Sequence, residues 1–207
     1  MSSRKNFLVV ISSPSGGGKS TLVSALLERV PDTRLSVSHT TRPPRPHERD
    51  GKDYHFISRE EFEHMCEHGE FLEWAEVFGN LYGTSRRMME EILAAGCDVI
   101  LDIDVQGAAQ IRRVVPDAVS IFIMPPAFSV LKQRLISRGT ETGAALERRL
   151  HVARQEMLRY TEFEYVVVND ELAEACTAVE AIVRAERQKR LRREEQAQGV
   201  LRTFQEG

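Results

Sequence analysis

The sequence predicts a three-layer α/β fold built around a central parallel sheet. Three observations lead to this class: short apolar runs that suit strands buried on both faces, amphipathic helical stretches between these runs, and a glycine-rich turn between the first run and the first helix. The chain has 207 residues, 42% of them hydrophobic, which is enough for one domain with a substantial core. We therefore expect one domain over residues 1–207, with smaller segments inserted into it.

Strands and helices are expected to alternate along the chain. Residues 7–11, Phe-Leu-Val-Val-Ile, form the first apolar run, and a helix is expected over residues 20–30, where Pro31 ends the helical spacing. Three further apolar runs are expected as strands, at residues 99–103, 119–124 and 165–168. Helices are expected between them near residues 108–115 and 129–137. Four apolar strands separated by helices are typical of an α/β fold.

A last helix is expected after the fourth apolar run, because six apolar residues share one helical stripe. These are Leu172, Ala175, Cys176, Val179, Ile182 and Val183. Such a stripe should pack against the sheet. The stretch 184–193 carries six basic residues, but glutamates intersperse or follow them. We interpret this stretch as a solvated helix end rather than as a nucleic-acid site.

Two segments interrupt the alternation. Residues 34–83 are rich in polar, aromatic and turn residues and contain two short helix signals, one of them the capping box 58–61, Ser-Arg-Glu-Glu. We expect this segment to be an inserted, ligand-binding subdomain. Residues 138–149 contain Gly139 and Gly143 among charges, which suits a mobile lid, expected over residues 126–149. The core then comprises residues 1–33, 84–125 and 150–207.

Composition excludes several classes of protein. A net charge of −3 gives no general reason to expect nucleic-acid binding. The apolar runs are far shorter than the roughly 20 residues of a membrane helix, and the first is too short for a signal peptide. Cys66, Cys97 and Cys176 lack metal or redox spacing, so we expect them to be small buried residues. A cytoplasmic protein without a membrane partner is predicted; the sequence does not indicate its oligomeric state.

The glycine-rich turn predicts a site for the phosphates of a nucleoside triphosphate. Residues 13–21, Ser-Pro-Ser-Gly-Gly-Gly-Lys-Ser-Thr, approximate the P-loop pattern G-x-x-x-x-G-K-[ST], with Ser13 in place of the first glycine. Glycine lets backbone N–H groups turn inward around a phosphate, Lys19 adds a full positive charge, and the Ser20 hydroxyl suits Mg²⁺. The alternative, a glycine-rich turn with an accidental lysine, is disfavoured by the strand before it and the helix after it. We therefore expect a P-loop NTPase fold. The predicted ATP-binding residues of the loop are Ser13, Pro14, Ser15, Gly16, Gly17, Gly18, Lys19, Ser20 and Thr21.

A second motif lies in the inserted segment. The pattern T-[ST]-R-x-x-[KR]-x-x-[DE]-x-x-[GA]-x-x-Y-x-[FY] is met at Thr40, Thr41, Arg42, Arg45, Glu48, Gly51, Tyr54 and Phe56. This pattern is the signature of the guanylate kinase family, which the sequence therefore resembles. The resemblance continues at Glu73 and in residues 82–84, 101–104, 134–139 and 168–170, so it covers most of the chain. It implies a kinase that transfers the γ-phosphoryl group of ATP to GMP or dGMP, with Mg²⁺ as cofactor.

The resemblance implies a GMP site with two halves. Arg42 and Arg45, with Tyr54 and Tyr82, would hold the phosphate, which suits arginine because its planar fork aligns two donors with phosphate oxygens. The base would be bound by Ser38, Glu73 and Thr84, with Asp104 nearby. One carboxylate can accept both N1–H and the exocyclic NH₂ of guanine, whereas adenine presents a lone pair at N1. Without the resemblance, Glu73 would be interpreted as an ordinary polar strand residue.

Two aspartates close the strand at residues 99–103. The spacing of Asp102 and Asp104 would send both side chains to one face of a strand, at the edge of the sheet where ligands bind in this architecture. One of them, more readily Asp102, would hold hydrated Mg²⁺ with Ser20, or orient Lys19 and GMP. Their roles stay open, and a turn-forming role is the alternative.

The resemblance also implies that arginines neutralise the transferred phosphoryl group. Arg134 and Arg138 lie four residues apart on one helical face, and Arg149 lies at the end of the expected lid. With Lys19 and Arg42 they make up the predicted catalytic set. Asn169 resembles a residue that contacts adenine, with a capping or turn role as the alternative.

The sequence also departs from the family in places and leaves other functions to weigh. His47 stands where the family often has glycine, and Gly143 where the lid is often acidic. A non-catalytic, peptide-binding module of the same ancestry is one alternative, which intact Lys19, Ser20 and Arg42 disfavour. A kinase for another small phosphate ester, such as a ribose bisphosphate, is the second, and it would leave the base-binding residues without a purpose.

Overall fold

The computed structural model describes residues 4–137 and 143–205 and confirms the predicted fold class. Its central sheet contains β1 (Leu8–Ser12), β2 (Thr33–Leu35), β7 (Asp98–Asp102), β8 (Val119–Met124) and β9 (Tyr165–Val168). The order is β2-β7-β1-β8-β9, and every neighbouring pair is parallel. Every residue of β1 is buried, as expected for the central strand of a sheet covered on both faces.

The prediction of four strands missed β2, which lies at one edge of the sheet. Its three residues, Thr-Arg-Leu, form no apolar run, because an edge strand is partly solvated and needs none. The expected start of the inserted segment at residue 34 therefore lies inside β2.

Helices cover both faces of the central sheet. The helices α1 (Lys19–Arg29) and α7 (Leu172–Glu186) pack on the face that carries Val9 and Ile11 of β1. On the other face, α3 (Arg86–Ala94) and α4 (Val105–Val114) pack against Leu8 and Val10. Alternate residues of one strand thus supply both cores. The predicted apolar stripe of α7 is wrong for Leu172, which begins the helix and is 44% exposed.

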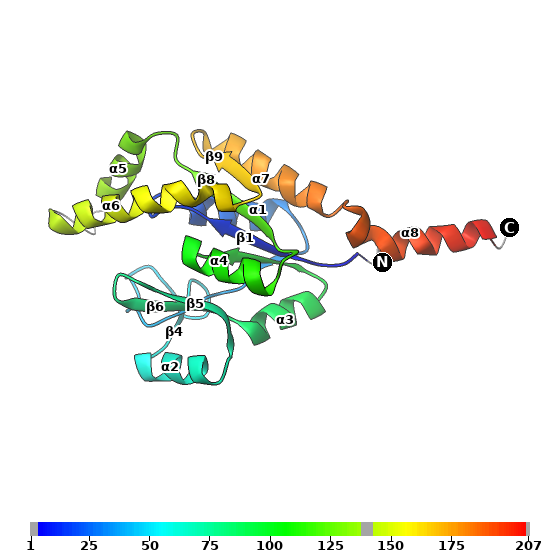
Figure 1. Ribbon diagram of the computed structural model, residues 1–207, viewed down its shortest axis with the longest axis horizontal. Helices are drawn as coiled ribbons and strands as arrows, with labels where there is room; N and C mark the ends of the chain where they lie inside the picture. Colours follow the sequence, from blue (N-terminus) through cyan, green and yellow to red (C-terminus); the bar gives the residue numbers. More distant parts are fainter. Residues whose placement is uncertain (1–3, 138–142, 206–207) are drawn as a thin grey trace.

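A second sheet lies below the first in Figure 1. It contains β3 (His39–Thr40), β4 (His55–Phe56), β5 (Phe71–Val77) and β6 (Asn80–Ser85), in the order β4-β3-β6-β5. The helix α2 (Arg59–Glu67) is capped by Ser58, whose hydroxyl accepts the Glu61 N–H at 3.0 Å, as the capping box predicts. Within residues 34–83, all of them described, α2 is the only helix, so the expectation of two short helices there is wrong.

The second sheet has a small core of its own, and two further helices follow the central sheet. Phe62, Phe71 and Leu81 form that core. The helices α5 (Phe128–Ser137) and α6 (Ala144–Leu158) pack on each other, and a 3₁₀ turn, η1 (Arg159–Glu162), leads to β9. Every helix in the described ranges is too short or too polar to cross a bilayer. The division into core, insert and lid stays a prediction.

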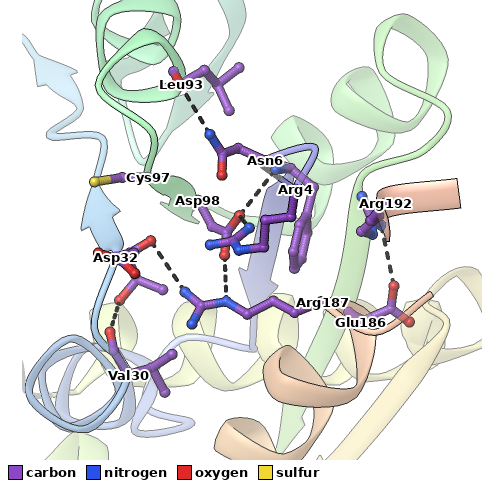
Figure 2. Close-up of polar contacts among 12 residues, drawn as sticks. Arg4, Asn6, Val30, Asp32, Leu93, Cys97, Asp98, Glu186, Arg187 and Arg192 are labelled. Atoms are coloured by element: carbon purple, nitrogen blue, oxygen red, sulfur yellow. Dashed lines mark hydrogen bonds and ion pairs between the residues drawn. The ribbon is translucent and has the colours of Figure 1, made fainter. Parts of the chain in front are cut away.

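Asp98 is fully buried at the start of β7, where parts of the chain from near both ends converge on it (Figure 2). Arg4 donates to its Oδ1, and the Arg187 Nε donates to its Oδ2 at 2.8 Å. The backbone N–H of Phe7 donates to Oδ1 at 3.2 Å. A buried carboxylate with two guanidinium groups and an amide is fully hydrogen-bonded, as its burial requires.

A second buried anion fixes the end of α7. Glu186 accepts from Tyr165, from Lys189 at 2.7 Å and from Arg192 at 3.2 Å. Arg187 and Arg192 are both buried, so the interpretation of residues 184–193 as a solvated helix end is wrong for these two. The reason is that α7 ends at Glu186 and the chain turns before α8 (Arg190–Gln205), which extends away from the rest of the molecule (Figure 1).

We predict that Asp98→Ala lowers the free energy of unfolding by about 3–5 kcal/mol, because it leaves two buried guanidinium groups without their anion. Asp117→Ala is the matched control, since the Asp117 carboxylate pairs with Lys5 at the surface, where loss costs under about 1 kcal/mol. Urea unfolding followed by circular dichroism measures both. Equal losses for the two variants would contradict a special role for Asp98.

Candidate active site

The loop between β1 and α1 adopts a P-loop conformation that depends on its glycines. Gly16 and Gly18 have φ values of 88° and 90°, which residues other than glycine rarely adopt. Gly17 is needed for space, since a Cβ there would lie 2.8 Å from the Cβ of Ser13. The Ser13 hydroxyl donates to the Pro14 carbonyl at 3.0 Å, so serine fits where the motif has glycine.

Lys19 and Ser20 at the start of α1 both contact Asp102 at the end of β7. The Lys19 Nζ lies 2.7 Å from Asp102 Oδ1 and donates to the Ile103 carbonyl at 2.6 Å. The Ser20 hydroxyl donates to Asp102 Oδ2 at 3.3 Å. One hydroxyl and one carboxylate at a phosphate-binding loop fit Mg²⁺, which takes few protein oxygens and completes its shell with phosphates and water.

Asp102 and Asp104 belong to different elements, since Asp102 ends β7 and Asp104 begins α4 as its N-cap. Because β7 ends at Asp102, the alternation of a strand does not extend to Asp104. Asp104 is instead the N-cap of α4, where its Oδ1 accepts the N–H groups of Gln106 at 3.0 Å and Gly107 at 2.8 Å. Asp104 still lines the cavity described below. Asp104 therefore has a local role in capping a helix, which is related to the turn-forming alternative but differs from it.

Arg134 and Asn169 both donate hydrogen bonds to the Gly17 carbonyl of the P-loop. The buried Asn169 donates from Nδ2 to the Gly17 carbonyl at 3.0 Å, and a Cβ on Gly18 would lie 2.3 Å from that nitrogen. Arg134 donates to the Asn169 carbonyl at 3.1 Å and to the Gly17 carbonyl at 3.4 Å. Both side chains thus hold the backbone of the loop.

Glu73 and Thr84 form a buried pair on neighbouring strands β5 and β6. Thr84 Oγ1 donates to Glu73 Oε1 at 2.6 Å. Thr84 is 0% exposed and Glu73 is 5% exposed. Burial raises the pKa of the Glu73 carboxyl to about 7; the hydrogen bond from Thr84 and the charge of Lys19 oppose this shift, while Asp104 adds to it. The other carboxylate oxygen, Oε2, does not receive this hydrogen bond from the Thr84 hydroxyl, and it too belongs to a buried side chain.

Arg42 and Arg45 lie in the loop between β3 and β4 and share one anion. The Arg42 Nη2 donates to both carboxylate oxygens of Glu48, at 2.8 and 2.9 Å, and the Arg45 N–H donates to Glu48 Oε2 at 2.8 Å. Although burial acts in the opposite sense, these donors hold the pKa of Glu48 below its usual range. The Arg42 guanidinium also lies 5.4 Å from the centroid of the Tyr54 ring, which it covers.

Tyr54 and Tyr82 meet edge to face, with ring centroids 5.9 Å apart. Burial, and then the charge of Asp102, raise the pKa of Tyr54 above its ordinary value, so its phenol keeps the proton and remains a donor. Ser38 precedes β3, and its carbonyl accepts the His55 N–H at 2.9 Å.

Arg149 connects α6 with the second sheet. Its guanidinium lies 5.1 Å from the centroid of the Phe78 ring, in the turn between β5 and β6. Phe78 has a φ of 51°, which places its ring outside the strand pattern. Arg138, the remaining predicted arginine, lies outside the described residues.

One cavity of about 250 Å³ joins the P-loop to the second sheet. Most predicted site residues line it: Ser13, Pro14, Ser15, Gly16, Gly17, Gly18, Lys19, Ser20, Ser38, Arg45, Tyr54, Glu73, Tyr82, Asp102, Asp104 and Arg149. Predicted residues that do not line it are Thr21, Arg42, Thr84, Arg134 and Asn169. Thr21 is exposed on α1, and the other four support residues of the loop or the wall.

Sequence reasoning missed Glu156, which also lines the cavity. Its Oε2 accepts the backbone N–H of Ser15 at 3.1 Å, and burial raises the pKa of its carboxyl. The signal was weak, because a glutamate in an amphipathic helix normally faces solvent. Ala75, Val77 and Ile103, also missed, supply apolar wall.

A P-loop at the carboxyl edge of a parallel sheet, facing a second sheet across one cavity, is the arrangement of the P-loop nucleoside monophosphate kinases. Residues 5–186 match the family model described as guanylate kinase. The chain is 50% identical over 194 residues to a guanylate kinase of Pseudomonas fluorescens, with 94% of each chain covered. It is 53% identical over 189 residues to one of Neisseria meningitidis, covering 91% of this chain and 92% of the other.

A solved structure agrees with these relatives. The crystal structure of guanylate kinase from Anaplasma phagocytophilum superposes with a TM-score of 0.76 at 38% identity, covering 92% of this chain and 90% of that one. The chain belongs to the guanylate kinase family.

We predict that Glu73→Gln stabilises the protein increasingly as the pH rises. The folded-state pKa of Glu73, about 7, lies above its ordinary value of 4.5, so the stability of the folded state falls as the pH rises through that window. The free energy of unfolding of the variant relative to wild type should therefore grow by up to about 3 kcal/mol between pH 4.5 and pH 8. Urea unfolding at both pH values measures it, and a constant difference would argue against a raised pKa.

Proposed function

We propose that this protein transfers the γ-phosphoryl group of ATP to GMP or dGMP, giving ADP and GDP or dGDP, with Mg²⁺ as cofactor. The observation that carries the proposal is one cavity lined on one side by the P-loop and on the other by buried Glu73. ATP bound at the P-loop and GMP bound at Glu73 would each direct their phosphates into the space between the two walls.

The P-loop would hold the donor. Its glycines and the start of α1 suit the phosphates of ATP, and Lys19 would exchange its contact with Asp102 for phosphate oxygens. Ser20 and Asp102 would hold Mg²⁺, which neutralises charge on the β- and γ-phosphates when it is bound. Arg134 and Asn169 would keep the loop in shape and border the adenine.

The second sheet and its loops would hold the acceptor phosphate. Arg45, Tyr54 and Tyr82 line the cavity. The Arg42 guanidinium lies over the face of the Tyr54 ring. Glu48 holds the Arg42 guanidinium through Nη2, and Nη1 donates to the Pro43 carbonyl at 2.7 Å, a contact that the fork would exchange for the phosphate. Tyr54 and Tyr82 would add O–H donors.

Glu73 would select guanine. Its buried carboxylate accepts one hydrogen bond from Thr84 and can accept N1–H and NH₂ of the base, while Ser38 donates to O6. Adenine would leave this anion without a donor at N1, and a desolvated, unpaired anion costs several kcal/mol. Asp104, at the same wall, would face the edge of the base.

The chemistry needs positioning and charge neutralisation rather than a protein base. A phosphate monoester oxygen is already ionised near neutral pH, so attack on the γ-phosphorus requires only alignment. Lys19, with Arg134, Arg138 and Arg149, would offset the charge that develops on the transferred group. The contact between Arg149 and Phe78 supports this role, because it brings α6 against the acceptor wall.

The remaining alternatives explain less of the site. A peptide-binding module has no use for the Lys19–Asp102 contact, and a kinase for a ribose phosphate has none for the Glu73–Thr84 pair. We further propose small-molecule partners without nucleic acid or membrane, consistent with the net charge of −3. Three free cysteines are consistent with the reducing conditions of a cytoplasm.

A coupled assay with ATP, Mg²⁺ and each of GMP, dGMP, AMP and UMP tests the proposal. We predict turnover with the two guanine nucleotides alone. Glu73→Gln should raise the KM for GMP by roughly 10- to 100-fold, because hydrogen bonds to a charged acceptor contribute roughly 1.5–3 kcal/mol. Lys19→Met should abolish turnover and serves as the blank. Equal rates with AMP, or an unchanged KM in the Glu73 variant, would show that another group binds the base.

We also predict that kcat/KM for GMP falls as the pH decreases below about 7, the folded-state pKa of Glu73. The protonated acid presents an O–H where guanine needs an acceptor, so affinity should drop about tenfold for each pH unit below the pKa. The profile from pH 5.5 to 8.5 measures this effect. Glu73→Gln is the control, because position 73 then no longer titrates while the phosphate of GMP and the other groups of the cavity still do; matching profiles for the two proteins would contradict the prediction.

A further inference from the structure

Gly107 is a glycine in a place where the backbone does not require one. It is the third residue of α4, is buried, and has an ordinary helical φ rather than a positive one. A glycine within a helix is destabilising relative to alanine. Its presence therefore needs another explanation.

The space that a side chain would need at this position is filled by the Glu73 carboxylate. A Cβ on Gly107 would lie 2.3 Å from Glu73 Oε2 and 2.9 Å from Glu73 Cδ. The next atom, Ile103 Cδ1, would be at 3.4 Å, which is an ordinary contact. The conflict is thus with one side chain, the one proposed to bind guanine.

Glu73 has little freedom to move away. Its other oxygen is held by Thr84 at 2.6 Å, and its side chain is buried. The strand itself is tied to α4, because Gln110 accepts the Trp74 N–H at 3.3 Å and donates to the Trp74 carbonyl at 2.7 Å. Residue 110 is one turn beyond residue 107, so the strand and the helix cannot separate easily at this point.

We propose that Gly107 is a specificity-determining position: the missing side chain leaves a recess in α4 in which the Glu73 carboxylate is held for the guanine base. This inference rests on the proposed role of Glu73. Gly107 acts through Glu73 as a positioning residue and does not itself touch the base. An alanine there would push the carboxylate out of line with the two guanine donors, while the P-loop would be unaffected.

The chain offers a matched control in Gly199, which lies within α8. A Cβ on Gly199 would meet nothing within 4 Å. Alanine in either helix removes the same backbone penalty, so the two substitutions differ in the contact with Glu73.

The first test compares Gly107→Ala with Gly199→Ala in the coupled assay. We expect Gly107→Ala to raise the KM for GMP at least tenfold, with the KM for ATP within about twofold of wild type and kcat at saturating GMP reduced far less than kcat/KM. Gly199→Ala should match wild type in all three. An unchanged KM for GMP in Gly107→Ala would overturn the proposal, and so would equal increases in the KM values for GMP and ATP.

The second test is a double-mutant cycle with Glu73→Ala, read by thermal unfolding and by GMP binding in calorimetry. If the recess exists to hold Glu73, Gly107→Ala should lower Tm in the wild-type background and raise it in the Glu73→Ala background. Should Gly107→Ala alone fail to fold, a well-folded double variant would support the proposal and an unfolded one would overturn it. If Glu73→Ala leaves GMP affinity unchanged, the proposed role of Glu73 fails, whereas the Tm cycle still reports whether position 107 holds that side chain.

Discussion

The parallel pairing of β1 with β7 is the constraint on which the site depends. The register sets Ile11 opposite Asp102, so the loops that leave both strands start from the same edge of the sheet. Lys19 and Asp102 are 83 positions apart in the chain and only 2.7 Å apart in space for this reason. Asn169 follows β9 at the same edge and binds the Gly17 carbonyl, so a third segment fixes the loop. Hydrophobic burial of the strands thus sets the position of the charged groups.

The opposite wall carries a charge that the free protein solvates poorly. Glu73 is buried, its pKa is raised to about 7, and a glycine on α4 makes room for it. Such an arrangement weakens the folded state near neutral pH, and natural proteins keep destabilising groups of this kind where a ligand supplies the missing donors. In the proposed function, stability and selectivity would therefore be opposed at this residue.

The sequence alone predicted the elements whose burial leaves a continuous apolar run, and it predicted the P-loop from its letters and context. It did not predict β2 or the short strands of the second sheet, because strands of two or three partly solvated residues have no periodic pattern. Glu156 and Arg187 look like ordinary surface residues of amphipathic helices; only tertiary contacts with Ser15 and Asp98 distinguish them. The proposed role of Glu73 came from the family resemblance, since the strand pattern alone gives it no special meaning. Gly107 was not predicted, because the space that its missing side chain leaves is filled by Glu73, a residue 34 positions away that only the folded structure brings next to it.

The two buried anions at the amino edge of the sheet have a mechanical consequence for the carboxyl edge. Asp98 joins segments from near the two ends of the chain, and Glu186 fixes the turn that follows α7. One side of the molecule is thereby held together by charged hydrogen bonds, whereas on the other side the Arg149 guanidinium of α6 lies over the Phe78 ring of the β5–β6 turn. In the proposed function, the sheet between these two sides would serve as a fixed platform beside which the two nucleotides enter and leave.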